Sequence, residues 1–271
     1  MSLTCADVDF ELKIAEFKIN GYTVFDDMIP IEKIDRIREA FLPLLAHIQQ
    51  RETEVSNVEL GDPRIGQGRL QTTNRYTLTI PWIAPFADPA IYEHPVILEF
   101  LVRIWRREGY VITCYHSNTP CQHSEFQHCH RDTGIAREIP HIGLETVPVV
   151  GVKFPLVDTT EENGSFEVLP STQYLANPEY EDRYDEILRA GHFPSAHRLN
   201  LKKGSMWIQD VRTLHRGTPN HTPDPRPELV VCYCRDWYAI ARNVEMPTAQ
   251  YEGLSDRGKQ LLKRYHKVDW D

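Results

Sequence analysis

Residues 147–170 read VPVVGVKFPLVDTTEENGSFEVLP, and the fold prediction starts from this stretch. Two short runs rich in apolar and β-branched residues, 147–157 and 165–169, lie on either side of Asn163-Gly164. Runs of this length bounded by turn residues are typical of strands, and Asn-Gly is typical of a tight turn between antiparallel strands. The stretch therefore predicts two strands of an antiparallel β structure.

Similar runs continue toward the C-terminus, whereas the N-terminal part has helical periodicity. The predicted strands are 22–25, 69–80, 110–117, 197–201, 205–209 and 228–238, with a turn at Lys202-Lys203-Gly204; the predicted helices are 7–19, 31–50, 89–107, 178–190 and 248–265, and 52–68 is a predicted loop. Helices followed by many short strands predict a mainly β fold, a sandwich or jelly roll with flanking helices packed outside.

The length of 271 residues suits a single domain over 1–271. Within it we expect a mostly helical part over 1–109, a jelly-roll core over 110–240 and a closing C-terminal helix over 241–271. A jelly roll brings residues from distant strands to one open mouth, where a site made of remote segments can assemble.

Charge and composition limit the partners. The net charge is −9, and no run of Lys or Arg occurs. Nucleic acid and anionic membrane surfaces are therefore excluded as expected partners. The first 20 residues lack an apolar signal core, and no window is apolar enough for a membrane span, so we expect a soluble cytoplasmic protein. The composition leaves monomer and homodimer both open.

The six cysteines are expected to be reduced thiols in that compartment. Cys121, His123 and Cys129 could suggest zinc, but no Cys-x₂₋₄-Cys pair occurs. Cys232-x-Cys234 on a strand has the wrong spacing for a zinc knuckle. Local spacing therefore gives zinc little support.

The segment 126–134 holds His130 and Asp132, two residues apart. On an extended strand this spacing puts both side chains on one face, where an imidazole and a carboxylate can bind one ion. With a second histidine they would form the 2-His-1-carboxylate triad of non-haem Fe(II) enzymes. The pair alone is weak, since such pairs arise by chance and His123-Ser124-Glu125 is another.

A later histidine changes the interpretation. His215 is followed eleven residues later by Arg226, just before a predicted strand. An arginine binds a carboxylate through two parallel hydrogen bonds, which suits a dicarboxylic 2-oxo acid whose other end is on the metal. His128 lies on the same face as His130 if the strand is extended. It could bind the metal directly, support one of the ligands from behind, or face the substrate.

At this point the sequence resembles the phytanoyl-CoA dioxygenase family of Fe(II)/2-oxoglutarate-dependent oxygenases. The motifs are Asn20-Gly-Tyr-Thr-Val, His130-Arg-Asp132, Glu162-Asn-Gly-Ser-Phe-Glu-Val-Leu-Pro170, Lys203-Gly-Ser-Met-Trp-Ile and the segment 215–226, in the family's order and separations. The resemblance implies a double-stranded β-helix, the cupin-like jelly roll. It also implies Fe(II), with 2-oxoglutarate and O2 as cosubstrates, and a reaction that releases succinate and CO2.

By the same resemblance, His130, Asp132 and His215 are the expected iron ligands, and Arg226 is the expected partner of the distal carboxylate of 2-oxoglutarate. Thr133 and Asn118 match positions that contact the cosubstrate in some relatives. Many relatives carry a serine where this chain has Gly217, so Thr218 or Asn118 is the expected replacement. Halogenating relatives have a small residue at the position of Asp132, which argues against halogenation here.

Other residues are candidates for the substrate pocket. They are Gln127, His128, Trp207, Tyr233, Arg235 and Trp237, although aromatic residues at strand spacing more often belong to a core. The absence of a basic cluster disfavours an acyl-CoA, whose phosphates need cations. We therefore expect a small polar or cationic metabolite, an intermediate of secondary metabolism.

Two classes of function are compatible with the sequence. The first is a 2-oxoglutarate-dependent hydroxylase of a small molecule, and the second is a cupin-type isomerase or metal-binding module without a cosubstrate. Arg226 discriminates between them, because a binding module needs no buried arginine opposite the metal. Hydroxylation is the expected outcome, while desaturation, epoxidation and epimerisation by the same centre stay open.

Overall fold

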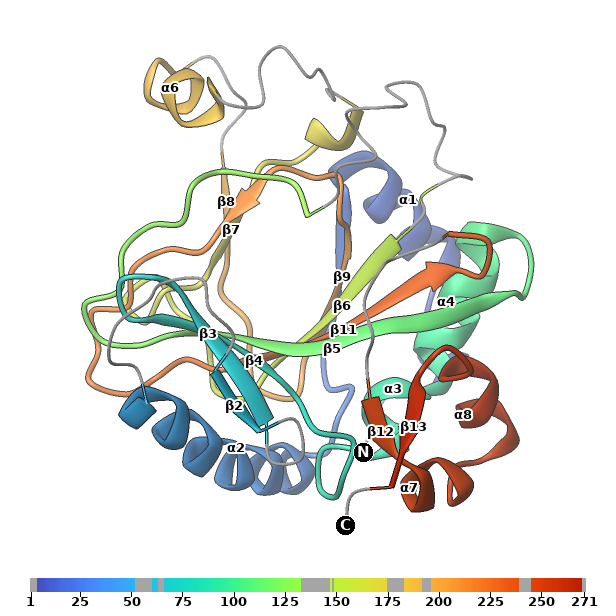
Figure 1. The fold of residues 1–271 in the computed structure, drawn as a ribbon. Helices are drawn as coiled ribbons and strands as arrows, with labels where there is room; N and C mark the ends of the chain where they lie inside the picture. Colours follow the sequence, from blue (N-terminus) through green and yellow to red (C-terminus); the bar gives the residue numbers. More distant parts are fainter. Residues whose placement is uncertain are drawn as a thin grey trace.

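The structure is a computed structural model that describes residues 4–51, 60–62, 66–132, 147, 149–174, 183–191, 196–238 and 245–269. Its framework is two antiparallel sheets (Figure 1). The larger contains, in order, β1 (Tyr22–Phe25), β9 (Met206–Asp210), β6 (Val149–Pro155), β11 (Glu228–Arg235), β5 (Tyr110–Pro120), β4 (Arg75–Thr79), β3 (Gly66–Thr72) and β2 (Leu60–Asp62). The smaller contains β10 (His215–Arg216), β7 (Phe166–Val168) and β8 (His197–Leu199).

The two faces of the larger sheet have different partners. On β11, Leu229, Val231 and Tyr233 belong to the main hydrophobic core, whereas Val230 and Cys232 belong to a separate apolar cluster. This alternation is the period of two of a strand. One face therefore packs against the helices, and the other faces the interior between the two sheets, where β7 and β9 meet through Phe166 and Trp207.

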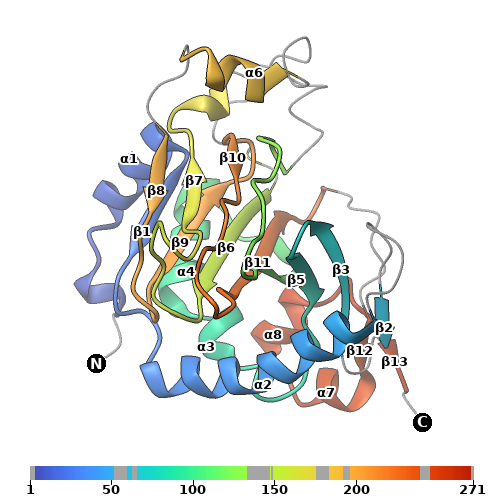
Figure 2. The ribbon, with the colours of Figure 1, turned by 90° about the vertical axis from the view of Figure 1, so that its left-hand side faces the viewer.

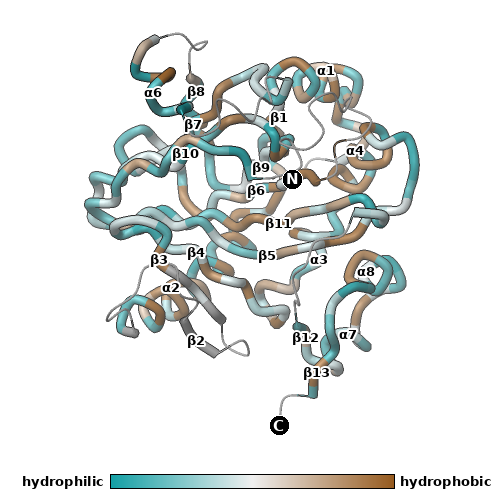
Figure 3. Tube along the Cα trace, turned by 45° about the horizontal axis from the view of Figure 1, so that its top comes forward, coloured by the Kyte–Doolittle hydropathy of each residue, from teal (hydrophilic) through white to brown (hydrophobic). Residues whose placement is uncertain are grey.

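Helices cover the outer face of the larger sheet (Figure 2). They are α1 (Phe10–Asn20), α2 (Ile31–Arg51), α3 (Pro89–Tyr92), α4 (Pro95–Trp105) and α8 (Asp256–Leu261). Hydrophobic residues gather along α4, β5 and β11 (Figure 3). None of the helices in the described part of the chain is both long and apolar enough to cross a membrane.

Several predicted elements are confirmed closely. The strand 22–25 is β1, the helix 31–50 is α2, and the helix 7–19 is α1, which ends at Gly21. Gly21 has the left-handed φ of +78°, and its N–H donates to the carbonyl of Phe17, which is a common helix C-cap. The Asn163-Gly164 turn also forms, with Gly164 at φ +86°.

Other elements differ from the predictions for local reasons. The predicted strand 69–80 is instead a hairpin of β3 and β4, because Asn74 at φ +51° turns the chain. The predicted loop 52–68 contains β2 and the start of β3. The helix 89–107 is broken into α3 and α4 at Pro95, which removes a backbone donor. Of the predicted helix 178–190, α6 (Tyr184–Arg189) is observed and 178–182 lie outside the described residues.

The predicted C-terminal helix 248–265 is also wrong in its length. Two short helices, α7 (Thr248–Glu252) and α8, replace it, and Gly253 and Ser255 lie between them. Ser255 caps α8 by accepting a hydrogen bond from the N–H of Gly258. The flanking strands β12 (Glu245–Pro247) and β13 (His266–Val268) pair in parallel.

Candidate metal and cosubstrate site

The structure brings His130, Asp132 and His215 together. His130 and His215 lie opposite each other in an antiparallel bridge, and each N–H donates to the other carbonyl at 3.0 Å. Asp132 is held by its own N–H, which donates to the carbonyl of Val211 at 3.0 Å. The bridge and this backbone hydrogen bond thus bring the three side chains together.

The reactive atoms of the three side chains converge. Oδ1 of Asp132 lies 3.5 Å from Nε2 of His130 and 3.3 Å from Nε2 of His215, and one candidate ligand atom of each residue lies within 4.8 Å of the others. The Nδ1 atom of each histidine lies within hydrogen-bond distance of a backbone carbonyl, that of His128 at 2.6 Å or that of Thr213 at 2.8 Å, and Nδ1 of His215 also lies 2.8 Å from Nε2 of Gln209. This leaves both Nε2 atoms to act as ligands.

Electrostatics favours the charge states that a metal needs at Asp132 and His215, whereas at His130 burial is outweighed by the hydrogen bond and charge of Asp132, which raise the pKa of the imidazole. Burial opposes ionisation of Asp132, but the neighbouring His215 and His130 outweigh it, so the pKa of Asp132 is well below its usual range. Burial lowers the pKa of His215, which favours neutral imidazole. An ionised carboxylate and a neutral imidazole are the metal-binding forms of these groups. The donor set therefore fits a 2-His-1-carboxylate iron site.

Arg226 lies just before β11 and is fully buried. Within the described residues, its Nε, Nη1 and Nη2 atoms have no hydrogen-bond partner. Glu228 Oε2 is 3.7 Å from Nη1 and also lacks a hydrogen bond there. Buried arginine donors without partners are costly, and a carboxylate would satisfy them. Arg226 thus fits the distal carboxylate of a dicarboxylic acid.

Sequence reasoning missed two buried cations. Lys153 on β6 donates to Oε1 of Gln209 at 2.5 Å, and its Nζ lies 4.0 Å from the Phe166 ring centroid and 4.3 Å from the centroid of Trp207. The sequence does contain a sign of this buried cation, because Lys153 is the one charged residue in the apolar run VVGVKFP. Its positive charge helps to lower the pKa of Asp132.

The second missed cation is Arg75 on β4. Its Nη2 donates to the carbonyl of Thr218 at 2.6 Å and to that of Glu125 at 3.2 Å, and its Nη1 lies 3.5 Å from Oδ1 of Asn118. Burial, then the nearby charge of Arg226, lowers the pKa of Arg75 to about 9. Arg75 is thus bonded to protein carbonyls, whereas Arg226 is not. No sequence pattern marked it.

The three looser cosubstrate candidates have different positions. Thr133 lies outside the described residues. Asn118 is half-buried on β5, opposite Glu228 and beside Arg75. The hydroxyl of Thr218 donates to the carbonyl of Ser165 at 2.8 Å and accepts from Arg198 at 2.6 Å, so it is already bonded within the protein.

Gly217 has a packing explanation. A Cβ atom there would overlap the guanidinium of Arg75 and would lie 2.5 Å from Oε1 of Gln127. Both neighbours are fixed, because Gln127 Oε1 accepts from the Gly217 N–H at 2.8 Å and Arg75 bonds to backbone carbonyls. The space that a serine side chain would need is therefore filled by Arg75.

We expect Gly217→Ser to lower the free energy of unfolding by about 1–3 kcal/mol, the usual cost of overpacking. Gly151→Ala is the matched control, because its new Cβ would meet only Lys153 Cε at 3.7 Å and Val211 Cγ1 at 3.9 Å, which are ordinary contacts. Urea unfolding of both variants measures the difference. Equal stability of Gly217→Ser and the parent protein would contradict the packing explanation.

The substrate candidates near the histidines are held by other residues. Gln127 bonds to Gly217 and, through Nε2, to Oε1 of Gln71 at 2.9 Å. His128 is exposed, and its Nδ1 bonds to Asp185 of α6. Trp207 is buried between the sheets, and its Nε1 donates to Oε1 of Glu228 at 2.9 Å.

The candidates in the C-terminal half of β11 and directly after it lie away from Arg226. The hydroxyl of Tyr233 donates to the carbonyl of Tyr92 in the outer core at 2.6 Å. Arg235 donates to the carbonyl of Trp105, at the end of α4, at 3.2 Å. Trp237 is 55% exposed, and its ring packs against Tyr238. These three residues have partners outside the metal site.

Comparison with known proteins identifies the family of the chain. The model of the phytanoyl-CoA dioxygenase family matches residues 17–227, and the chain belongs to this family. Members use Fe(II), 2-oxoglutarate and O2, and the chain is an Fe/2-oxoglutarate-dependent enzyme of this family. The expected class and cofactors are thereby confirmed.

Solved structures share the jelly-roll fold. AviO1 from Streptomyces viridochromogenes Tue57 is 18% identical, with a TM-score of 0.62 over 86% of this chain and 98% of that chain. HygX from Streptomyces hygroscopicus, solved with nickel, 2-oxoglutarate and hygromycin B, is 14% identical. Its TM-score is 0.59, and the match covers 99% of this chain and 98% of HygX. SnoN, a non-haem epimerase from nogalamycin biosynthesis, is 19% identical. Its TM-score is 0.56, and the match covers 83% of this chain and 82% of SnoN.

Proposed function

We propose that this enzyme hydroxylates an unactivated C–H bond of a small polar metabolite, an intermediate of natural-product biosynthesis. His130, Asp132 and His215 bind the iron, and Arg226 binds the distal carboxylate of 2-oxoglutarate. The observation that carries the proposal is the buried Arg226 guanidinium, whose three nitrogens lack hydrogen-bond partners in the described part of the chain, although Nη1 lies 3.7 Å from Oε2 of Glu228. A cupin-type module without a cosubstrate would have no use for this group.

When bound, iron, 2-oxoglutarate and O2 supply the oxidising chemistry and yield succinate and CO2. The chain supplies positioning. His130, Asp132 and His215 would hold the ion, and a set of three protein ligands would leave coordination positions for exogenous ligands. Phe166 stacks on His215 with ring centroids 5.2 Å apart, and the carbonyl of Thr213 holds the same ring by Nδ1. The ligand is therefore fixed before the metal binds.

The substrate class has two supports. Solved relatives were crystallised with nogalamycin RO or hygromycin B, which are small molecules. The net charge of −9 and the lack of Lys or Arg runs disfavour a phosphate-rich acyl-CoA. Asp132, a carboxylate rather than a small residue, supports oxygenation over halogenation. Epimerisation, the activity in the name of SnoN, is the second candidate reaction, since it uses the same kind of centre.

Anaerobic addition of Fe(II) and then 2-oxoglutarate should produce the weak visible charge-transfer band of a chelated 2-oxo acid. Candidate metabolites should then stimulate succinate release in air, with a product heavier by one oxygen atom. A product of unchanged mass would replace hydroxylation with epimerisation. A protein with neither the band nor succinate formation would refute the oxygenase assignment.

A further inference from the structure

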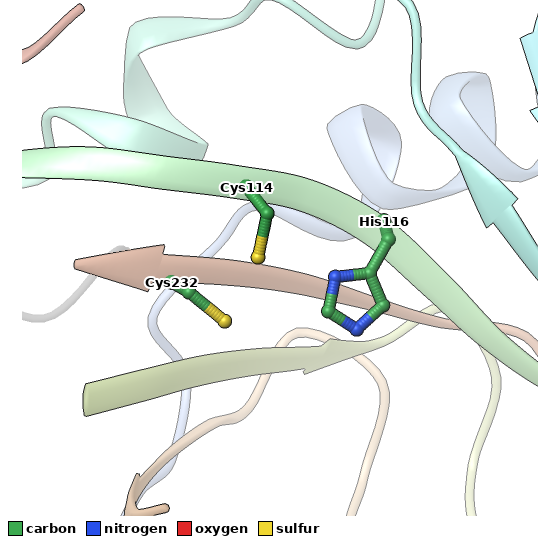
Figure 4. Close-up of side chains that lie close together, drawn as sticks. All are labelled: Cys114, His116 and Cys232. Atoms are coloured by element: carbon green, nitrogen blue, oxygen red, sulfur yellow. The ribbon is translucent and has the colours of Figure 1, made fainter. Parts of the chain in front are cut away.

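Three further metal-ligand side chains meet on the interior face of the larger sheet. Cys114 of β5 lies directly opposite Cys232 of β11, and His116 follows two residues along β5 on the same face. One candidate ligand atom of each lies within 4.8 Å of the others. Figure 4 shows both sulfur atoms and a ring nitrogen of His116 directed into the same space.

The imidazole of His116 has a buried nitrogen atom, Nδ1, that is not used in a hydrogen bond within the described residues. The position beside Cys232 on β6 is Gly151, where even an added Cβ would meet no atom closer than 3.7 Å. Val230 separates His116 from Lys153 in the adjacent row of the sheet. No side chain of β6 stands beside Cys232, and none of the three residues of the cluster belongs to the proposed iron site.

We infer that Cys114, His116 and Cys232 form a second metal site, selective for a thiophilic cation such as Zn²⁺. Two sulfurs and one imidazole are the donor set that such cations prefer. Ligand atoms of a tetrahedral zinc site lie about 3.8 Å apart or less, so small side-chain rotations suffice. With three protein ligands, a tetrahedral ion would keep a fourth position for an exchangeable ligand.

Without the ion, the thiol of Cys232 holds its proton. The hydrogen bond to Cys114 and burial raise the pKa of Cys232 well above its usual range. Binding of a cation must displace this proton, so metal affinity at this site should increase with pH.

Cobalt(II) is the probe, added anaerobically to the full chain stripped of metal. The parent protein should show the intense near-ultraviolet thiolate-to-cobalt charge transfer of a sulfur-ligated site. Cys114→Ser and Cys232→Ser should each lose most of this intensity, and His116→Gln should weaken it. Cys234→Ser is the matched control, because Cys234 lies on the same strand and in the same apolar cluster but outside the three-residue group; it should keep the band.

Absence of the band in the parent protein, or its persistence in both serine variants, would overturn the inference. If the variants do not fold, alkylation of the parent protein decides: Zn²⁺ should protect Cys114 and Cys232 but not the exposed Cys5, as read by peptide mass spectrometry. Equal labelling with and without Zn²⁺ would refute the site. The Fe(II)/2-oxoglutarate band tests the iron site separately and should survive in both serine variants.

Discussion

Arg226→Gln should raise the KM for 2-oxoglutarate by at least about 30-fold. Truncating one partner of a buried, hydrogen-bonded charge pair costs about 2–5 kcal/mol, and each 1.4 kcal/mol is about tenfold. Arg226 is suited to such a pair because it is fully buried and its guanidinium has no hydrogen-bond partner in the described residues. Succinate formation at varied 2-oxoglutarate, together with the anaerobic charge-transfer titration, measures the effect.

Arg75→Gln is the matched control, since Arg75 is the other fully buried arginine of this region. Its guanidinium already bonds to the carbonyls of Thr218 and Glu125, so its loss should lower the melting temperature more than it changes the KM. Arg226→Lys should keep part of the affinity for 2-oxoglutarate, because lysine keeps the positive charge but cannot form the bidentate hydrogen bonds of arginine. A large KM increase in Arg75→Gln with none in Arg226→Gln would give the cosubstrate role to Arg75.

The residues proposed to bind iron could be selected from the sequence because their geometry is local. A spacing of two on an extended strand puts His130 and Asp132 on one face. Only the pairing of His130 with His215 required the fold, and the order of the family motifs supplied it. The position of Arg226 could also be predicted from the sequence, because this charged residue comes just before a predicted strand that is rich in β-branched residues.

The Cys114–His116–Cys232 group could not be found in this way. Zinc had little support because Cys232 and Cys234 have the wrong spacing, yet the group forms across two strands. Its alignment depends on the register of β5 against β11, which shifts between Cys232 and Tyr233. A one-residue shift moves side chains to the opposite face, and sequence periodicity does not fix such a shift.

The absent serine at position 217 illustrates the same limit. The sequence suggested Thr218 or Asn118 as the replacement, but the hydroxyl of Thr218 is bonded to Ser165 and Arg198. The neighbour that excludes a side chain at Gly217 is Arg75, which is more than a hundred residues earlier in the chain. Contacts of this kind depend on packing between sheet strands rather than on local pattern.

His215→Ala should weaken Fe(II) binding by at least about 100-fold, so that stoichiometric metal no longer binds. Changes in the groups that merely orient a ligand cost about 10–100-fold, and removal of a ligand should cost more. The side chain is buried, its ring stacks on Phe166, and its Nε2 lies 3.3 Å from Oδ1 of Asp132. No other histidine in the described residues completes the group with His130 and Asp132.

His128→Ala is the matched control for this loss. His128 precedes His130 by two residues, but its side chain is exposed and bonds to Asp185 of α6 rather than to the other two ligands. Its backbone carbonyl, which accepts from Nδ1 of His130, remains in the variant. Iron binding should therefore be kept, as measured by equilibrium dialysis and the 2-oxoglutarate charge-transfer band. Retained tight binding in His215→Ala together with loss in His128→Ala would transfer the third ligand role to His128.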